Sequence, residues 1–283
     1  MTLVAPFYDR QGRFSPLKTL VFISIVLPAF WLVYLGITDQ LGAKPLTAAL
    51  HETGTWALRF LLAALAITPL RLITRQNRLL AVRRILGVSA LAYALIHFGL
   101  YTVQMKLDLG IVVREIASRF YLTIGFVSLL AMLAMGVTST DSAVKRLGTA
   151  RWARLHKLIF PLTVLALWHA FIQAKIDVSE VVVMSGVFLA LIGVRLMRGR
   201  FAYNATTLCF LAVLVACLAL VIEYAWYALA TGVPAMRILV ANFDYDLLPR
   251  PAFLVLVIAA LLPILSFAFR MRDERATPRI NLN

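Results

Sequence analysis

Apolar residues occur in eight long runs along the chain, separated by short segments that hold nearly all of the charged residues. A helix of about 20 residues is long enough to cross the roughly 30 Å hydrocarbon core of a bilayer. A transmembrane β-barrel would instead show short strands of alternating polarity. The pattern therefore predicts an all-α membrane protein, a polytopic helical bundle of about eight transmembrane helices. The expected spans are 17–37, 54–73, 85–105, 119–137, 155–174, 178–196, 206–230 and 251–269.

The composition supports this class of protein. Hydrophobic residues make up 62% of the chain and charged residues 14%, whereas charged residues make up about 25% of a typical soluble domain. The first apolar run is too long for the apolar part of a signal peptide and has no small-residue cleavage site, so we expect it to remain as the first span.

Basic residues are divided unevenly between the two sets of segments that connect the spans. Twenty Lys and Arg lie on the side that also carries both chain ends, and seven lie on the other side. By the positive-inside rule, this asymmetry predicts cytoplasmic N- and C-termini. The net charge of +15 is then explained by topology and by attraction to anionic lipid headgroups, and nucleic-acid binding is not needed to explain it.

The segments between the spans are too short for a soluble catalytic domain. The longest reach only about twenty residues, and neither a Rossmann nor a Walker phosphate-binding motif occurs in the sequence. We therefore expect any reductant or source of energy to come from a separate partner.

Histidine is scarce in this chain, with one residue at each of positions 51, 97, 156 and 169. His97 lies thirteen residues into the third span and His169 about as far into the fifth, so both should lie roughly 20 Å above the inner boundary. Two imidazoles at matched depth on different helices can supply both axial nitrogens of a haem iron, which favours electron transfer over oxygen binding. The alternative is that each histidine only forms a hydrogen bond with a neighbouring helix.

Two further points bear on the interpretation of these histidines as metal ligands. The spans offer no cysteine or carboxylate near that depth to complete a tetrahedral zinc site, so haem is the better candidate. His156 and His169 do not share a face of an ideal helix, although Pro161 between them is expected to kink the span.

Four segments resemble the MsrQ family, also called YedZ, of the ferric-reductase-like transmembrane group. They are HETGTWALRFLLAALAITPLR (51–71), RRILGVSALAYALIHFGLYT (83–102), SRFYLTIGFVSLLAMLAMGVTST (118–140) and KRLGTARWARLHKLIF (145–160). The resemblance covers residues 17–200, which we take as a six-helix haem-binding domain. Residues 201–283 are expected to add two transmembrane helices of unknown role.

The resemblance implies a haem b held by His97 and His169 and a flavin mononucleotide (FMN). It also implies delivery of electrons to a periplasmic molybdopterin-dependent methionine-sulfoxide reductase that repairs oxidised proteins. The electron donor is expected to be a cytosolic flavin reductase or a membrane quinol, and the expected location is the bacterial inner membrane.

The inner end of the third span departs from the pattern of related oxidases that stack two haems. Those proteins have a histidine where this chain has Arg83 or Arg84. His156 is then a one-sided haem ligand, a neighbour of the flavin or a plain interfacial histidine. Arg83, Arg84 and Arg151 are candidates to bind the flavin phosphate or a haem propionate, and the alternative is that they only set topology and contact lipid.

At the outer end of the second span, His51 and Arg59 lie on one helical stripe. Arg59 is a candidate to hold a haem propionate and His51 to contact the periplasmic partner, whereas the alternative for Arg59 is that its side chain extends to the interface.

The leading hypothesis is therefore an electron-transfer subunit rather than a catalytic subunit. One alternative is a transmembrane ferric or cupric reductase that acts directly on external metal. The other is a transporter, which is disfavoured because no inverted repeat or pair of broken helices is evident in the sequence.

Overall fold

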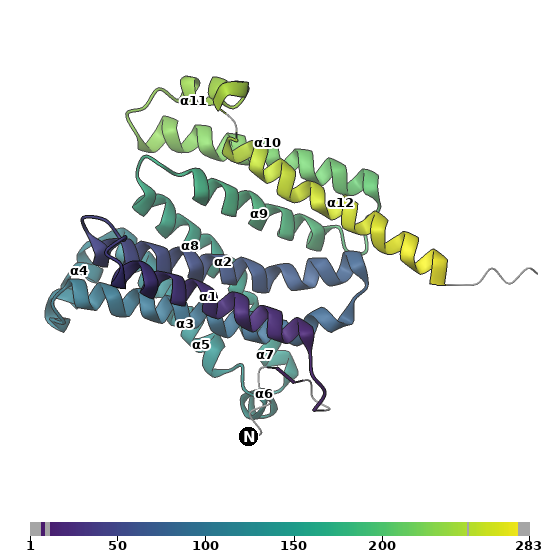
Figure 1. The fold of residues 1–283 in the computed structure, drawn as a ribbon, viewed down its shortest axis with the longest axis horizontal. Helices are drawn as coiled ribbons and strands as arrows, with labels where there is room; N and C mark the ends of the chain where they lie inside the picture. Colours follow the sequence, from purple (N-terminus) through teal and green to yellow (C-terminus); the bar gives the residue numbers. More distant parts are fainter. Residues whose placement is uncertain (1–6, 9–11, 248, 277–283) are drawn as a thin grey trace, which may run out of the picture. The chain divides into compact units, whose positions relative to one another are not determined.

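The chain is helical throughout most of its length (Figure 1). The computed structural model describes residues 7–8, 12–247 and 249–276. Arg10 and Arg279, which counted toward the charge asymmetry, lie outside the described residues. The helices are α1 (Pro16–Ile37), α2 (Pro45–Thr74), η1 (Asn77–Leu79), α3 (Leu80–Gln104), α4 (Leu109–Ser118), α5 (Phe120–Val137), α6 (Asp141–Leu147), α7 (Thr149–Leu155), η2 (His156–Leu158), α8 (Ile159–Ala174), α9 (Ser179–Leu196), α10 (Ala205–Ala230), α11 (Ala235–Ala241), η3 (Tyr245–Leu247) and α12 (Pro251–Ala276).

Within the described residues, eight helical segments are long and apolar enough to cross a membrane. Their number agrees with the eight spans expected from the sequence, and the prediction of a multi-pass α-helical membrane protein is confirmed. Large apolar side chains on these helices are exposed, among them Leu20, Ile23 and Phe30 of α1. Such surfaces are stable in lipid rather than in water. The prediction that both chain ends are cytoplasmic stays a prediction.

The helix bounds differ from the expected spans at two places in particular. Helix α2 begins at Pro45 rather than near residue 54, so His51 lies inside the helix rather than before it. The fifth span is not one helix but α7, η2 and α8 in succession, with a 3₁₀ turn at His156–Leu158. Pro161 follows directly, and proline lacks the N–H and crowds the carbonyl four residues before it, so the helix is broken rather than only kinked.

The short helices α4, α6, α7 and α11 were not expected from the apolar pattern. The side chain of Asp108 caps the first turn of α4 by accepting from Ile111 N (3.0 Å). Thr140 caps α6 by accepting from Ala143 N (3.2 Å). A capping side chain satisfies backbone N–H groups that would otherwise lack a partner at the start of the helix.

The chain forms two compact units, each described here by itself. Unit 1 comprises residues 1–64 and 80–173, and unit 2 comprises residues 65–79 and 174–283. In unit 1, α3 packs against α1 and α5, and α4 packs against α5. The hydroxyl of Tyr93 in α3 donates a hydrogen bond to the carbonyl of Ile25 in α1 (2.7 Å).

Unit 2 consists mainly of α9, α10 and α12, which pack against one another. Glycines permit this close packing, because a Cβ added at Gly186 would collide with Val255, and one at Gly193 would collide with Leu211. Helices in lipid associate through such close contacts rather than through the hydrophobic effect. The expected division at residue 200 concerns resemblance to a family rather than packing, and it stays a prediction.

Glu223 in α10 has its partners within unit 2. It is 1% exposed, and its carboxylate accepts from Arg250 Nη2 (2.6 Å) and Asn242 Nδ2 (3.0 Å). Arg250 lies just before α12 and Asn242 just after α11. Through these two hydrogen bonds, the carboxylate of Glu223 holds the segment that connects α10 and α12 against α10.

Candidate functional site

His97 of α3 and His169 of α8 lie next to each other in unit 1. The centroids of the two imidazole rings are 6.3 Å apart, and the ring planes are inclined at 86°. Both residues are half-buried. The structure thus brings together the two histidines that the depth estimate paired.

A backbone carbonyl of a neighbouring helix orients each ring. His97 Nδ1 lies 2.8 Å from the carbonyl oxygen of Leu50 in α2, and His169 Nδ1 lies 2.8 Å from that of Tyr121 in α5. A carbonyl oxygen can only accept, so Nδ1 carries the proton in both rings, and Nε2 of the neutral imidazole has the lone pair. Metal-binding histidines in proteins are commonly fixed in this way.

Glycine makes room for both carbonyl contacts. Gly54 follows Leu50 by four residues, and Gly125 follows Tyr121 by four residues. A Cβ at Gly54 would lie 2.9 Å from His97 Nδ1, and a Cβ at Gly125 would lie 2.9 Å from His169 Nδ1. Both histidines therefore have the same surroundings, namely a carbonyl acceptor and a glycine four residues later on the facing helix. The sequence did not predict this arrangement.

The separation of the rings suits a metal held between them. An imidazole nitrogen binds a metal at about 2 Å, so two ligands on opposite sides have nitrogens about 4 Å apart. A centroid separation of 6.3 Å leaves roughly 1 Å from each nitrogen to the centre of its ring, which matches the radius of an imidazole ring. Among the described residues, no group of three or more His, Cys, Asp or Glu could hold a bare metal ion. A macrocycle that supplies the other four ligands fits this pair of residues.

The other candidate side chains on α2 and α3 have different surroundings. His51 is exposed and close enough to His97 to interact with it electrostatically. The guanidinium carbon of Arg59 lies 4.5 Å from the centre of the Trp56 ring, in a cation–π contact. Tyr101 follows His97 by one helical turn, and its hydroxyl is buried without a hydrogen-bond partner among the described residues. The sequence analysis missed Tyr101 as a site residue, although its spacing of four from His97 was a signal.

His156 lies apart from this pair in sequence and has different neighbours. Its ring centroid is 4.1 Å from that of Trp152, and its Nε2 is 3.5 Å from the hydroxyl oxygen of Thr138. The indole N–H of Trp152 donates to the carbonyl of Thr138 (3.0 Å). Arg83 is close enough to interact with His156 electrostatically. The turn η2 thus places His156 between an aromatic ring, a hydroxyl and a cation.

The three arginines predicted for an inner phosphate differ in their surroundings. Arg84 forms an ion pair with Asp141 of α6 (2.8 Å), with both side chains largely exposed. Arg151 is exposed at the start of α7. Of the three, Arg83 is therefore the one whose contact with His156 makes it part of a cluster.

Comparison with known proteins shows which family the chain is similar to. The model of the family described as "Ferric reductase like transmembrane component" matches residues 53–167, a range that includes His97 and His156 and ends just before His169. The "Protein-methionine-sulfoxide reductase heme-binding subunit MsrQ" of Xanthomonas euvesicatoria pv. vesicatoria is 38% identical over 196 residues, covering 67% of this chain and 89% of the relative. The chain belongs to the MsrQ family.

Other MsrQ proteins are similar to the same extent. The chain is 38% identical to the protein of Polaromonas naphthalenivorans over 197 residues, which is 66% of this chain and 90% of the relative. It is 37% identical to the protein of Rhodospirillum rubrum over 190 residues, which is 67% of this chain and 89% of the relative. No solved structure matches the chain. About a third of this chain thus lies beyond what it shares with these MsrQ proteins.

Proposed function

We propose that this chain is a membrane electron-transfer subunit that holds one haem b between His97 and His169. The MsrQ relatives are named as heme-binding subunits of protein-methionine-sulfoxide reductase. The observation that most supports the proposal is the 6.3 Å pairing of two imidazoles, each with Nδ1 engaged by a carbonyl and Nε2 left with its lone pair. A haem iron with both axial positions filled by protein supplies one-electron transfer rather than oxygen binding.

The chain's own residues position the cofactor and set its surroundings. The carbonyls of Leu50 and Tyr121 fix the orientation of the two ligand rings, and hydrogen bonding at Nδ1 raises the basicity of Nε2. The buried hydroxyl of Tyr101 and the guanidinium of Arg59 are suited to bind carboxylates such as the haem propionates. These contacts and the apolar surroundings are the means by which a protein adjusts a haem potential.

The path of electrons on either side of this site is also part of the proposal. Electrons enter from a cytosolic flavin reductase or a quinol and leave to a periplasmic molybdopterin-dependent methionine-sulfoxide reductase. FMN binds near His156, where Arg83 and Arg151, both exposed, would neutralise its phosphate. His51, exposed near His97, is placed to contact the periplasmic partner.

The test is to reduce the purified protein and follow its reoxidation by visible absorption. We expect rapid reoxidation only when both the periplasmic reductase and a methionine-sulfoxide substrate are present. Rapid reoxidation by ferric citrate without the reductase would instead favour the metal-reductase alternative, which the ferric-reductase-like family model also fits. A colourless protein from haem-replete cells would contradict the proposal and favour a transporter.

A further inference from the structure

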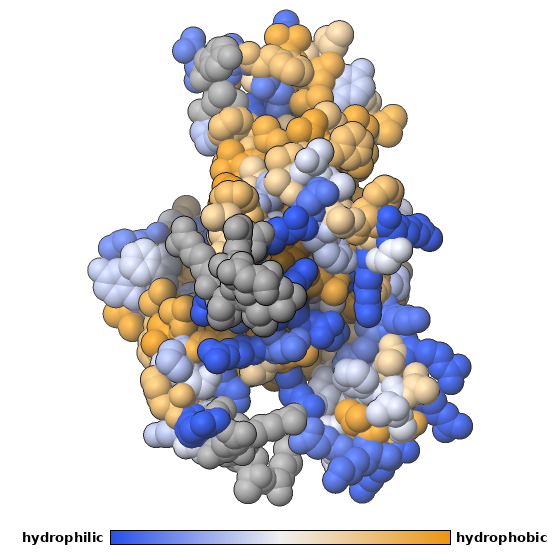
Figure 2. Space-filling view, turned by 90° about the vertical axis from the view of Figure 1, so that its right-hand side faces the viewer, coloured by the Kyte–Doolittle hydropathy of each residue, from blue (hydrophilic) through white to orange (hydrophobic). Residues whose placement is uncertain are grey.

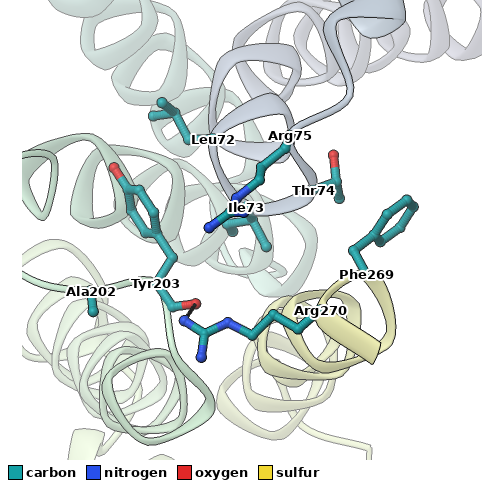
Figure 3. A pocket seen from close by; sticks show the side chains of 8 residues that line it. All are labelled: Leu72, Ile73, Thr74, Arg75, Ala202, Tyr203, Phe269 and Arg270. Carbon is teal, nitrogen blue, oxygen red and sulfur yellow. Dashed lines mark hydrogen bonds between the residues drawn. The ribbon is translucent and has the colours of Figure 1, made fainter. Parts of the chain in front are cut away.

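A cavity of about 250 Å³ lies within unit 2 (Figure 3). Its walls come from the end of α2, from the segment before α10 and from the last turns of α12. These positions coincide with the ends of three candidate membrane spans. The cavity therefore lies at a membrane boundary.

The surroundings of this cavity are strongly basic. Segments 71–78, 195–203 and 269–272 contain eight arginines and no acidic residue. Arg75 and Arg270 line the cavity and extend toward the same space beside Tyr203 (Figure 3). Burial raises the pKa of the Tyr203 phenol, so this residue adds no negative charge. Figure 2 faces the side on which α2 and α12 end, and hydrophilic residues lie among hydrophobic ones on this face.

Two arginines near the end of α2 add to the basic character of this region. Arg75 directly follows the helix in a left-handed backbone conformation (φ 58°), and its N–H caps the helix by donating to the carbonyl of Arg71 (2.9 Å). Arg71 lies one turn earlier, and its Nε is buried without a hydrogen-bond partner among the described residues. By contrast, the guanidinium of Arg195 is held by the carbonyls of Leu65 and Leu191.

Part of the remaining wall is apolar. Leu72, Ile73 and Phe269 line the cavity beside the two arginines. A site that combines guanidinium groups with apolar side chains at the end of membrane spans fits a phosphate ester attached to acyl chains. A soluble phosphate would gain nothing from the apolar part of the wall.

We propose that this cavity binds the headgroup phosphate of an anionic phospholipid, with Arg75 and Arg270 as its main ligands. Half of the lining residues, from Ala202 to Arg270, lie beyond residue 200, where the resemblance to the MsrQ family is predicted to end. The site is therefore expected to be a property of this longer chain. It does not depend on the haem proposal.

The test measures protection of the purified full-length protein against thermal unfolding by dioleoyl phosphatidylglycerol in detergent. We expect protection at micromolar lipid in the wild type and a half-saturating concentration at least about tenfold higher in the R75Q/R270Q variant, because two charge-assisted hydrogen-bond donors are removed. The R78Q/R272Q variant removes the same charge from exposed arginines outside the cavity and should bind like the wild type. Leu72→Trp, which fills the cavity without changing the charge, should weaken binding as the double variant does.

Several outcomes would overturn the proposal. Equal protection by dioleoyl phosphatidylcholine would show that the headgroup charge is not recognised. Protection by inorganic phosphate or FMN without protection by the lipid would assign the cavity to a soluble phosphate. Undiminished lipid binding in both R75Q/R270Q and Leu72→Trp would place the lipid elsewhere. The visible haem spectrum, recorded on the same samples, should not differ among these variants.

Discussion

At the scale of single residues, Gly54 and Gly125 hold equivalent positions beside the two histidines. Each follows by four residues the residue whose carbonyl accepts from the histidine, and a Cβ at either position would come within 2.9 Å of a ring atom. The ring cannot move away without losing its hydrogen bond to the carbonyl. The orientation of both histidines therefore depends on the absence of a side chain on the facing helix.

Replacing either glycine by alanine should reduce haem binding without unfolding the protein. Alanine is favoured over glycine inside a helix by about 1 kcal/mol, so the helices themselves are not weakened. Displacing the partner that orients a ligand typically lowers affinity by roughly 10–100-fold, and we expect that loss in Gly54→Ala and Gly125→Ala. Haem per protein, measured by the pyridine haemochrome method, checks this.

The control for this experiment is Gly99→Ala. Gly99 lies in α3 two residues after His97, and nothing lies within 4 Å of an added Cβ. The haem content of this variant should equal that of the wild type. Wild-type haem content in Gly54→Ala and Gly125→Ala would show that the glycines do not position the ligands.

The pairing of His97 with His169 could be predicted from the sequence, whereas the contacts that orient them could not. Depth follows from counting residues along each span, and both histidines are about equally far from the inner boundary. The partners of Nδ1 depend on which faces of α2 and α5 turn inward. These helices are apolar on nearly all sides, so the sequence does not specify the buried face.

At the scale of helices, the connection between α10 and α12 depends on one buried carboxylate. Glu223 is the shared partner of Arg250 and Asn242. Glu223 is 1% exposed and the Arg250 side chain is 21% exposed, so removing the carboxylate leaves a partly buried guanidinium without its partner, which lowers stability. Glu223→Ala should therefore lower the midpoint of thermal unfolding clearly, and Glu223→Gln should lower it less, because the amide oxygen can still accept a hydrogen bond.

Glu52→Ala provides the control, since Glu52 is an exposed acid of α2. Its unfolding midpoint should stay close to that of the wild type. An unfolding midpoint of Glu223→Ala equal to that of Glu52→Ala would show that the ion pair contributes no net stability.

The long helices could be predicted and the short ones could not. Each of the eight apolar runs predicts one helical span, because a backbone in lipid must pair its own N–H and C=O groups and a helix does so within a single segment. Helices such as α4 and α11 have only 10 and 7 residues, and isolated helices of that length are not stable by themselves. They form because neighbouring helices and capping side chains support them, which local sequence does not reveal.

At the scale of the whole molecule, the distribution of Lys and Arg predicts one orientation in the membrane. Both chain ends, and the connection between α2 and α3, should face the cytoplasm. In a background without Cys209 and Cys217, Arg78→Cys should react with an impermeant maleimide only after the membrane is permeabilised. Lys106→Cys, at the other end of α3, should react in intact cells whose outer membrane is permeable. The reverse labelling pattern would contradict this orientation and the proposed direction of electron transfer.

The most direct test of the central claim is the reduced-minus-oxidised absorption spectrum of purified His97→Ala and His169→Ala, compared with the wild type. We expect the bands of a six-coordinate haem b to be lost in both variants. His51→Ala and His156→Ala should keep the bands of this site, because neither residue is one of its axial ligands. Bands of wild-type intensity and position in both His97→Ala and His169→Ala would show that these two imidazoles do not hold the iron.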